Sequence, residues 1–161
     1  MEAEPVKDMK KIALIVAGGT GSRMNKELPK QFLLLKNKPV LYYTLKAFLE
    51  AYDDLEIILV LPGEHIGKGQ EIIDGYFDHS RLRICAGGRT RFHSVQNGLA
   101  LIHEESIVFV HDGVRCLITG NLIKKCYEAA VESVAGRYRD RPYRAGAGCG
   151  WHRGHGLSND P

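Results

Sequence analysis

Between residues 11 and 136 the chain alternates short apolar runs with longer segments of helical periodicity. Runs dominated by Ile, Val, Leu and Phe are typical of strands that are covered on both faces of a sheet. Such runs occur at Ile12–Ala17, Glu56–Leu61, Arg83–Ala86 and Ile107–His111. Helices are predicted between and after these runs, at Val40–Ala51, Ile66–Phe77, Arg91–Leu101 and Asn121–Ala135.

This alternation of strand and helix restricts the chain to few topologies. A β-α-β-α order with short connections predicts parallel strands joined by right-handed crossovers. The expected architecture is therefore a doubly wound, Rossmann-like α/β fold with a mostly parallel sheet and helices on both faces. Parallel strands end at one edge of the sheet, and open α/β folds bind their ligands in the loops at that edge.

The pattern of strands and helices stops after Gly136. Residues 137–161 contain five Gly, five Arg and two Pro and almost no aliphatic residue, so this tail cannot bury an apolar face and is expected to be disordered. We predict one domain, 1–136, and a Gly/Arg-rich tail, 137–161, so the fold is expected to be incomplete at its C-terminus. The abrupt change suggests a shifted reading frame or a truncation, a hypothesis that an intact gene sequence through codon 136 would refute.

Charge and composition exclude several classes of protein. Residues 1–136 carry 17 Lys+Arg and 17 Asp+Glu, so the net charge of +3 lies in the tail. A neutral body argues against a nucleic-acid surface, which needs a basic face. The apolar run at 12–17 is far shorter than the ~20 residues of a membrane span, and no cleavable signal pattern precedes it. The four cysteines form no CxxC pair, which favours reduced thiols and a cytoplasmic location.

The loop after the first predicted strand, AGGTGSRM at 17–24, is rich in glycine. Glycines let successive backbone N–H groups turn toward one point and let a phosphate approach closely. The loop is not a Walker sequence, because no Gly-Lys-Ser/Thr follows, and Met24 replaces the third glycine of a dinucleotide fingerprint. Arg23 and Lys30 supply two cations instead, which suits a polyphosphate and a phosphoryl-transfer transition state. An ordinary Gly-rich turn with solvated cations is the alternative.

Two further loops are expected at the same edge of the sheet. AGGRTRFHS at 86–94 opens a helix and can present donors to a base edge or a phosphate, although an ordinary capped helix start is the alternative. HDGVR at 111–115 offers a carboxylate for a hydroxyl group or Mg²⁺ and an arginine for a phosphate, although an Asp-Gly turn is often only a turn. Three such loops at one edge favour a ligand site. No metal site held by the protein is predicted, because C-x-x-H-x-x-H at 149–155 lacks a fourth ligand.

Four motifs occur in order along the chain: AGGTGSRM at 17–24, PKQF at 29–32, GG-x-x-R-x-x-SV at 87–95 and VHDG-x-R at 110–115. Together they resemble those of the 2-C-methyl-D-erythritol 4-phosphate cytidylyltransferases, which belong to the sugar-nucleotidyltransferase group. The resemblance implies transfer of CMP from CTP to 2-C-methyl-D-erythritol 4-phosphate, with release of pyrophosphate, in the non-mevalonate isoprenoid route. It also implies Mg²⁺, bound mainly through the phosphates of CTP.

The resemblance further implies a role for each matched residue. Arg23 and Lys30 would stabilise the transition state at the α-phosphorus, and Asp112 and Arg115 would contact the ribose or the acceptor. The nucleophile is a phosphate monoester oxygen that is already anionic, so no general base is needed. The implied CTP-binding residues are Ala17, Gly18, Gly19, Gly88, Arg89, Ser94 and Gly113.

The chain departs from the family pattern in two places. Cys116 stands where the family usually has proline, and the family's later strands, dimerisation arm and acceptor-binding residues have no match in 137–161. Acceptor discrimination lies in that unmatched part, so a ribitol 5-phosphate cytidylyltransferase and an inactive CTP-binding fragment are the alternatives. The expected partners are CTP and a sugar-alcohol phosphate, with neither nucleic acid nor membrane; the family is homodimeric.

Overall fold

The computed structural model describes residues 9–18 and 28–139, and all four long strands predicted above lie in one parallel sheet. The order across this sheet is β5-β4-β1-β6. The predictions on Gly19, Arg23 and residues 140–161 fall outside the described residues. The strands are β1 (Lys10–Val16), β4 (Glu56–Leu61), β5 (Leu82–Ala86) and β6 (Ser106–Asp112).

The order of the strands locates the edge where ligands are expected. Numbered along the chain, these four strands lie in the order 3-2-1-4, so the direction of winding reverses at β1. Val16, the last residue of β1, pairs with Val60 on one side and with Asp112 on the other. The edge of the sheet at the carboxyl ends of β1 and β6 is therefore the topological switch point, the usual ligand site of a doubly wound fold.

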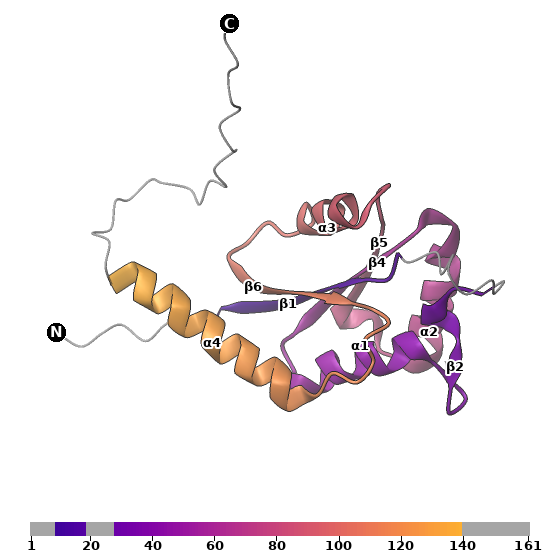
Figure 1. Ribbon diagram of the computed structural model, residues 1–161, viewed down its shortest axis with the longest axis horizontal. Helices are drawn as coiled ribbons and strands as arrows, with labels where there is room; N and C mark the ends of the chain where they lie inside the picture. Colours follow the sequence, from indigo (N-terminus) through magenta and orange to yellow (C-terminus); the bar gives the residue numbers. More distant parts are fainter. Residues whose placement is uncertain (1–8, 19–27, 140–161) are drawn as a thin grey trace, which may run out of the picture.

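Helices cover both faces of the sheet, which confirms the doubly wound fold. Figure 1 shows α3 on one face of the sheet and α1 and α4 on the other. In α1, Leu41, Leu45 and Phe48 recur at helical spacing and are at most 1% exposed, so they form the face of the helix that packs in the core. The helices are α1 (Val40–Ala51), α2 (Ile66–Tyr76), α3 (Arg91–Leu99) and α4 (Gly120–Arg139).

The core consists of two apolar clusters separated by the sheet. Alternate residues of β1 point to opposite faces: Ala13 and Ile15 pack with α1, α2 and α4, whereas Ile12 and Leu14 pack beneath α3. Gly98 of α3 lies directly against Leu14, because a Cβ at this position would overlap that side chain. Burial on both faces explains why β1 and β4 are continuous apolar runs rather than alternating ones. The edge strands β5 and β6 are only partly buried, so the expectation that they are covered on both faces is not met for them.

Some elements differ from the predicted ones. The sequence did not predict a hairpin of β2 (Leu34–Leu35) and β3 (Lys38–Pro39), whose two turn residues have positive φ. Three short 3₁₀ turns, η2 (Lys30–Phe32), η3 (Gly63–His65) and η4 (His79–Arg81), were not predicted either.

The last helix is longer than predicted. It continues to Arg139 and includes 137–139, which the sequence pattern assigned to the disordered tail. A single glycine costs a helix only about 1 kcal/mol relative to alanine, so Gly136 does not end it.

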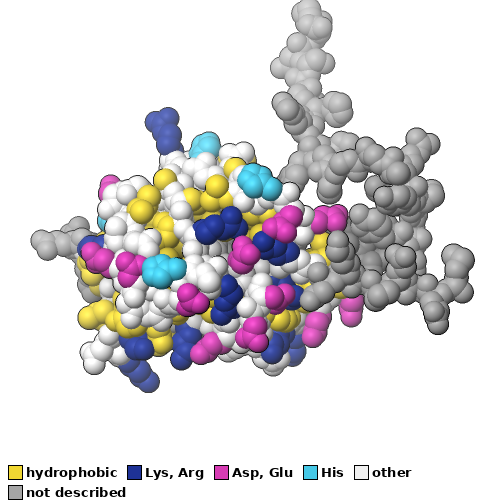
Figure 2. Space-filling model, turned by 180° about the vertical axis from the view of Figure 1, so that it is seen from behind, with side chains coloured by type: hydrophobic (Ala, Val, Ile, Leu, Met, Phe, Trp, Pro, Cys, Tyr) yellow, Lys and Arg dark blue, Asp and Glu magenta, His cyan; other side chains and the backbone are white. Residues whose placement is uncertain are grey.

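The described residues show how charged side chains and thiols are distributed. On the face seen in Figure 2, basic and acidic side chains are intermixed rather than gathered into separate patches. Cys85, Cys116 and Cys126 are free thiols, while Cys149 lies outside the described residues. Within the described part of the chain, no helix is long and apolar enough to cross a membrane.

Candidate functional site

Three predicted loops meet at the carboxyl edge of the sheet. Each begins with a backbone N–H that donates to the carbonyl oxygen of an adjacent strand. Ala17 donates to Val60 at 2.9 Å, Gly87 donates to Leu61 at 2.7 Å, and Gly113 donates to Val16 at 2.8 Å. The loops after β1, β5 and β6 therefore begin at the same edge of the sheet, as expected for parallel strands.

Glycines let these loops pack closely against one another. A Cβ added to Gly113 would lie 2.8 Å from the Cβ of Ala17, closer than real side chains approach. A Cβ added to Gly87 would lie 2.8 Å from Ser94 Oγ, and one added to Gly18 would lie 4.0 Å from the same atom. The loops after β1 and β5 thus come together around Ser94.

Ser94 fixes the loop that precedes α3. Its side chain is 4% exposed, donates to the Thr90 carbonyl oxygen at 3.0 Å and accepts from the Gly88 N–H at 3.0 Å. Thr90 caps α3 by accepting from the N–H of His93 at 3.3 Å. The capped helix start therefore forms, and Ser94 holds Gly88 in place beside it. Arg89, in the same loop, is exposed.

Two arginines hold the carboxylate of Asp112 at the switch point. Arg91, at the start of α3, donates to Oδ1 from Nε at 3.1 Å and from Nη2 at 3.0 Å. Arg115 donates to Oδ2 from Nε at 2.9 Å. Partial burial raises the pKa of Asp112, but these hydrogen bonds outweigh it and the pKa falls below its ordinary value. The site therefore contains an ionised carboxylate between two guanidinium groups.

Arg91 joins the site only through the fold. It was part of the motif at 87–95 but carried no predicted role, because the sequence cannot show that the start of α3 faces the end of β6. The side chains of Arg91 and Arg115 are 60% and 75% exposed. Their remaining N–H groups are thus accessible to an anionic ligand.

His111 and Thr44 make contacts at the same edge of the sheet, beside the loop after β6. The His111 ring packs against Phe48 at 5.3 Å between centroids, and its Nδ1 has no hydrogen-bond partner within the described part of the chain. Burial lowers the pKa of His111, so the ring is neutral at pH 7. Thr44 Oγ1 donates to the Gly113 carbonyl oxygen at 2.8 Å, a buried anchor that the sequence did not reveal.

The turn η2 brings Lys30 to the loop after β1. Lys30 is exposed, whereas the next residue, Gln31, is completely buried and donates from Nε2 to the Ala17 carbonyl oxygen at 2.8 Å. This hydrogen bond connects the PKQF motif to the first residue of the glycine-rich loop. The sequence pattern alone indicates no role for Gln31, although the residue lies within the PKQF motif.

Among the described residues, the loops after β1, β5 and β6 contribute one carboxylate, that of Asp112, and both of its oxygens are engaged by arginine. Within the described ranges, no group of three or more His, Cys, Asp or Glu residues could hold a metal ion. Mg²⁺ commonly takes one or two carboxylates together with substrate phosphates and water. The residues present therefore fit a cation that is held through a bound polyphosphate.

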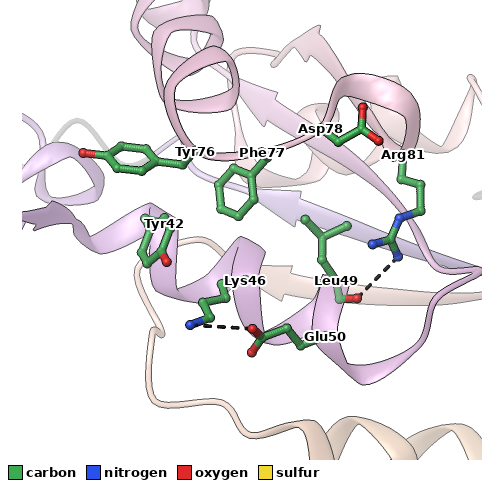
Figure 3. Close-up of a pocket in the computed structure, with 8 residues that line it drawn as sticks. All are labelled: Tyr42, Lys46, Leu49, Glu50, Tyr76, Phe77, Asp78 and Arg81. Atoms are coloured by element: carbon green, nitrogen blue, oxygen red, sulfur yellow. Dashed lines mark hydrogen bonds and ion pairs between the residues drawn. The ribbon is translucent and has the colours of Figure 1, made fainter.

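A separate hollow of about 320 Å³ lies between α1 and the end of α2 (Figure 3). An ion pair between Lys46 and Glu50, at 3.6 Å, lies on one side of it. Arg81, on the other side, donates to the carbonyl oxygens of Leu49 at 3.3 Å and Tyr52 at 2.9 Å. None of the predicted site residues lines this hollow. Its arginine stabilises the C-terminal end of α1 by satisfying carbonyl groups there.

Comparison with known proteins gives one consistent result. The model of the 2-C-methyl-D-erythritol 4-phosphate cytidylyltransferase family matches residues 11–141. A protein of that name from Bacteroides thetaiotaomicron is 46% identical over 127 residues, which cover 79% of this chain and 58% of the relative. One from Bacteroides fragilis is 49% identical over 124 residues, which cover 76% of this chain and 56% of the relative. The chain thus spans little more than half the length of these relatives.

A solved structure shows the same fold. The 4-diphosphocytidyl-2C-methyl-D-erythritol synthase of Anaerococcus prevotii is 28% identical and superposes with a TM-score of 0.63. The match covers 75% of this chain and 51% of the other. The family resemblance inferred from the four motifs is therefore confirmed.

Proposed function

Because this chain belongs to the 2-C-methyl-D-erythritol 4-phosphate cytidylyltransferase family, we propose that it transfers CMP from CTP to 2-C-methyl-D-erythritol 4-phosphate. In this reaction a phosphate oxygen of the acceptor forms a bond to the α-phosphorus of CTP. The bond from the α-phosphorus to the bridging oxygen of the β-phosphate breaks, and pyrophosphate leaves. No proton has to be removed from the nucleophile, because a phosphate monoester is already anionic near neutral pH.

Positioning and charge neutralisation are the main requirements of this chemistry. The backbone at Ala17, Gly18 and Gly19 would bind the triphosphate, and Lys30 and Arg23 would stabilise charge that builds up at the α-phosphorus. Mg²⁺, held mainly by the phosphates, would supply further neutralisation when it is bound. This assignment is supported by the hydrogen bond from Gln31, the residue after Lys30 in η2, to the carbonyl oxygen of Ala17.

The other two loops would recognise the rest of the nucleotide and the acceptor. Gly88, Arg89 and Ser94 would surround the cytosine, and Asp112, Gly113 and Arg115 would contact the ribose or the acceptor. His111 is not a candidate general base in this scheme, because it is half-buried against Phe48 and its pKa is lowered. Cytoplasmic location and assembly with a second copy remain predictions.

The observation that carries the proposal is the convergence of three family motifs at the switch point, where Asp112 lies between Arg91 and Arg115. Its test is a pyrophosphate-release assay of the 161-residue chain. The assay crosses the four nucleoside triphosphates with methylerythritol 4-phosphate and ribitol 5-phosphate. Release with CTP and methylerythritol 4-phosphate is expected. Turnover with ribitol 5-phosphate instead would correct the acceptor, and turnover with another nucleotide would overturn the cytidylyl assignment.

A second candidate function is CTP binding without turnover. It is favoured by the residues matched at this edge, which the resemblance assigns mainly to CTP rather than to the acceptor. Calorimetric titration with CTP distinguishes the two candidates when it is combined with the assay. Binding without pyrophosphate release supports the second candidate, whereas the absence of CTP binding rejects both.

A further inference from the structure

Gln31 is a completely buried amide side chain beside the loop that follows β1. Its neighbours in η2 keep it in place: the N–H of Phe32 donates to the Pro29 carbonyl oxygen at 3.0 Å, and the Phe32 ring packs edge-on against His65 at 5.4 Å. Gln31 Nε2 donates to the Ala17 carbonyl oxygen at 2.8 Å. Because a carbonyl oxygen only accepts, the NH₂ side of the amide must face Ala17.

This hydrogen bond controls the direction of the next N–H group. The carbonyl of Ala17 and the N–H of Gly18 belong to one peptide unit, which is planar and trans, so the two groups point in opposite directions. Drawing the carbonyl oxygen toward Gln31 therefore turns the Gly18 N–H away from Gln31. Gly18 is exposed and has no Cβ, so a ligand can reach this N–H closely.

We propose that Gln31 is a positioning residue that orients the Gly18 amide to donate to a phosphate group of the bound nucleotide. The identification of that nucleotide as CTP rests on the proposed function, whereas the phosphate contact itself does not. Lys30 is the residue before Gln31 and is exposed at the same turn. The turn thus brings an ammonium group and an oriented amide to the same loop.

Two observations distinguish this role from simple packing. The end of β1 is already fixed without Gln31, because the Ala17 N–H donates to the Val60 carbonyl oxygen at 2.9 Å. In addition, Gln31 Oε1 is buried and has no hydrogen-bond partner in the described part of the chain. A buried unpaired oxygen is unfavourable, and an apolar side chain of similar length would fill the space without that cost. The presence of an amide side chain at position 31 is therefore explained by its NH₂ group, which donates to the carbonyl oxygen of the peptide unit between Ala17 and Gly18.

The test compares Gln31→Met with Arg81→Met in the full chain. Arg81 bonds to the end of α1, outside the three loops, so its variant controls for lost stability. Dissociation constants are measured by calorimetry for CTP, cytidine and inorganic tripolyphosphate, and each melting temperature is recorded. A hydrogen bond to a charged group corresponds to roughly a tenfold or larger change in affinity. Gln31→Met is expected to bind CTP and tripolyphosphate about tenfold more weakly, with cytidine binding unchanged.

The ratio of cytidine to CTP dissociation constants separates positioning from general loss of structure. Arg81→Met is expected to melt at a lower temperature and keep the wild-type ratio. A wild-type ratio in Gln31→Met would overturn the inference, whether the two dissociation constants stay unchanged or rise by the same factor. Tripolyphosphate binding that depends on Gln31 in a chain that does not bind CTP would preserve the inference and reject the proposed function.

A measurement on the wild-type chain keeps the inference testable if Gln31→Met does not fold. Tripolyphosphate is titrated into ¹⁵N-labelled protein, and the amide resonance of Gly18 is followed by NMR. A downfield shift of the Gly18 proton is expected, with the Gln31 side-chain resonances retained. A Gly18 resonance that does not move at saturation, or the absence of tripolyphosphate binding, would overturn it.

Discussion

Single residues decide the charge at the switch point. Partial burial raises the pKa of Asp112, but the hydrogen bonds from Arg91 and Arg115 outweigh it and hold the pKa below its ordinary value, so the carboxylate stays ionised near neutral pH. The same carboxylate keeps the two guanidinium groups near each other at the end of β6. Removing its charge would leave both arginines without the acceptor that orients them.

The first prediction concerns Asp112→Asn. The amide cannot accept on both sides in the way a carboxylate does, so the two arginines should lose their fixed positions. We expect a fall in kcat/KM on the order of 10²-fold for the acceptor, similar to the loss of other charge-orienting groups. Steady-state kinetics measures this change, and circular dichroism checks the fold. Unaltered kcat/KM would remove Asp112 from the site.

Lys30 gives the second prediction. Its side chain is exposed, so Lys30→Ala should leave the melting temperature within about 1 °C of wild type, as surface substitutions usually do. If the ammonium stabilises the transition state, kcat should fall on the order of 10²-fold with little change in the KM for CTP. Lys36→Ala is the matched control, because Lys36 is exposed at the β2–β3 turn. Equal kcat for wild type and Lys30→Ala would contradict the assigned role.

The third prediction concerns pH and His111. Burial lowers the pKa of His111 in the folded protein, so the unfolded chain takes up its proton first as the pH falls. Stability from the neutral ring is therefore complete above pH ~6.5 and decreases as the pH falls toward and through the lowered folded pKa. Urea unfolding at pH 7.5 and pH 5.5 should show a smaller loss for His111→Leu than for wild type. Identical losses of stability in the two proteins would show that protonation of His111 does not cause the decrease at low pH.

At the scale of elements, the contact of α3 with the sheet sets the position of the loop before it. Gly98 lets α3 lie directly on Leu14 and Val60. The start of the same helix carries Thr90, Arg91 and Ser94. The helix thus connects packing in the apolar cluster on its face of the sheet to the site.

The fourth prediction compares two helical glycines. At Gly98 an added Cβ would overlap Leu14, so Gly98→Ala should destabilise the fold by about 1–3 kcal/mol and weaken CTP binding. At Gly67 of α2 nothing lies within 4 Å of an added Cβ, so Gly67→Ala should stabilise the helix by up to about 1 kcal/mol. Urea unfolding measures both. An unchanged free energy of unfolding in Gly98→Ala would mean that α3 can move away from Leu14 without loss of stability.

At the scale of the whole molecule, Lys11 joins elements from both ends of the described chain. It is 3% exposed, forms an ion pair with Asp54 at 2.8 Å, and lies over the rings of Tyr52 and Tyr127. Tyr127 belongs to α4, and its ring contacts that of Tyr52. The attachment of the last helix to the sheet therefore includes a cation that contacts two neighbouring aromatic rings.

The fifth prediction tests this attachment. Tyr127→Ala removes the ring over Lys11, so α4 should open locally more often than the sheet does. Hydrogen exchange should become faster in α4, while the amides of β1 and β4 keep their protection. Equal acceleration in β1, β4 and α4 would indicate that α4 and the sheet unfold as one unit.

The amino-acid sequence determined the elements of the fold and the loops that carry the site. Runs such as Glu56–Leu61 and the spacing of Leu41, Leu45 and Phe48 are local patterns, and the helix Val40–Ala51 forms with the predicted bounds. The four motifs also identified the family, which the match over residues 11–141 confirms. Local periodicity is sufficient for these conclusions because it reflects which face of each element is buried.

Tertiary structure alone decided which residues meet. The order β5-β4-β1-β6 sets β6 beside β1, so Asp112 comes next to the end of the first strand. The placement of α3 brings Arg91 to Asp112, and the turn η2 buries Gln31 against Ala17. These contacts join residues that are far apart in the chain, and they depend on how whole elements pack. No local pattern encodes that packing, because the same strands and helices fit more than one sheet order.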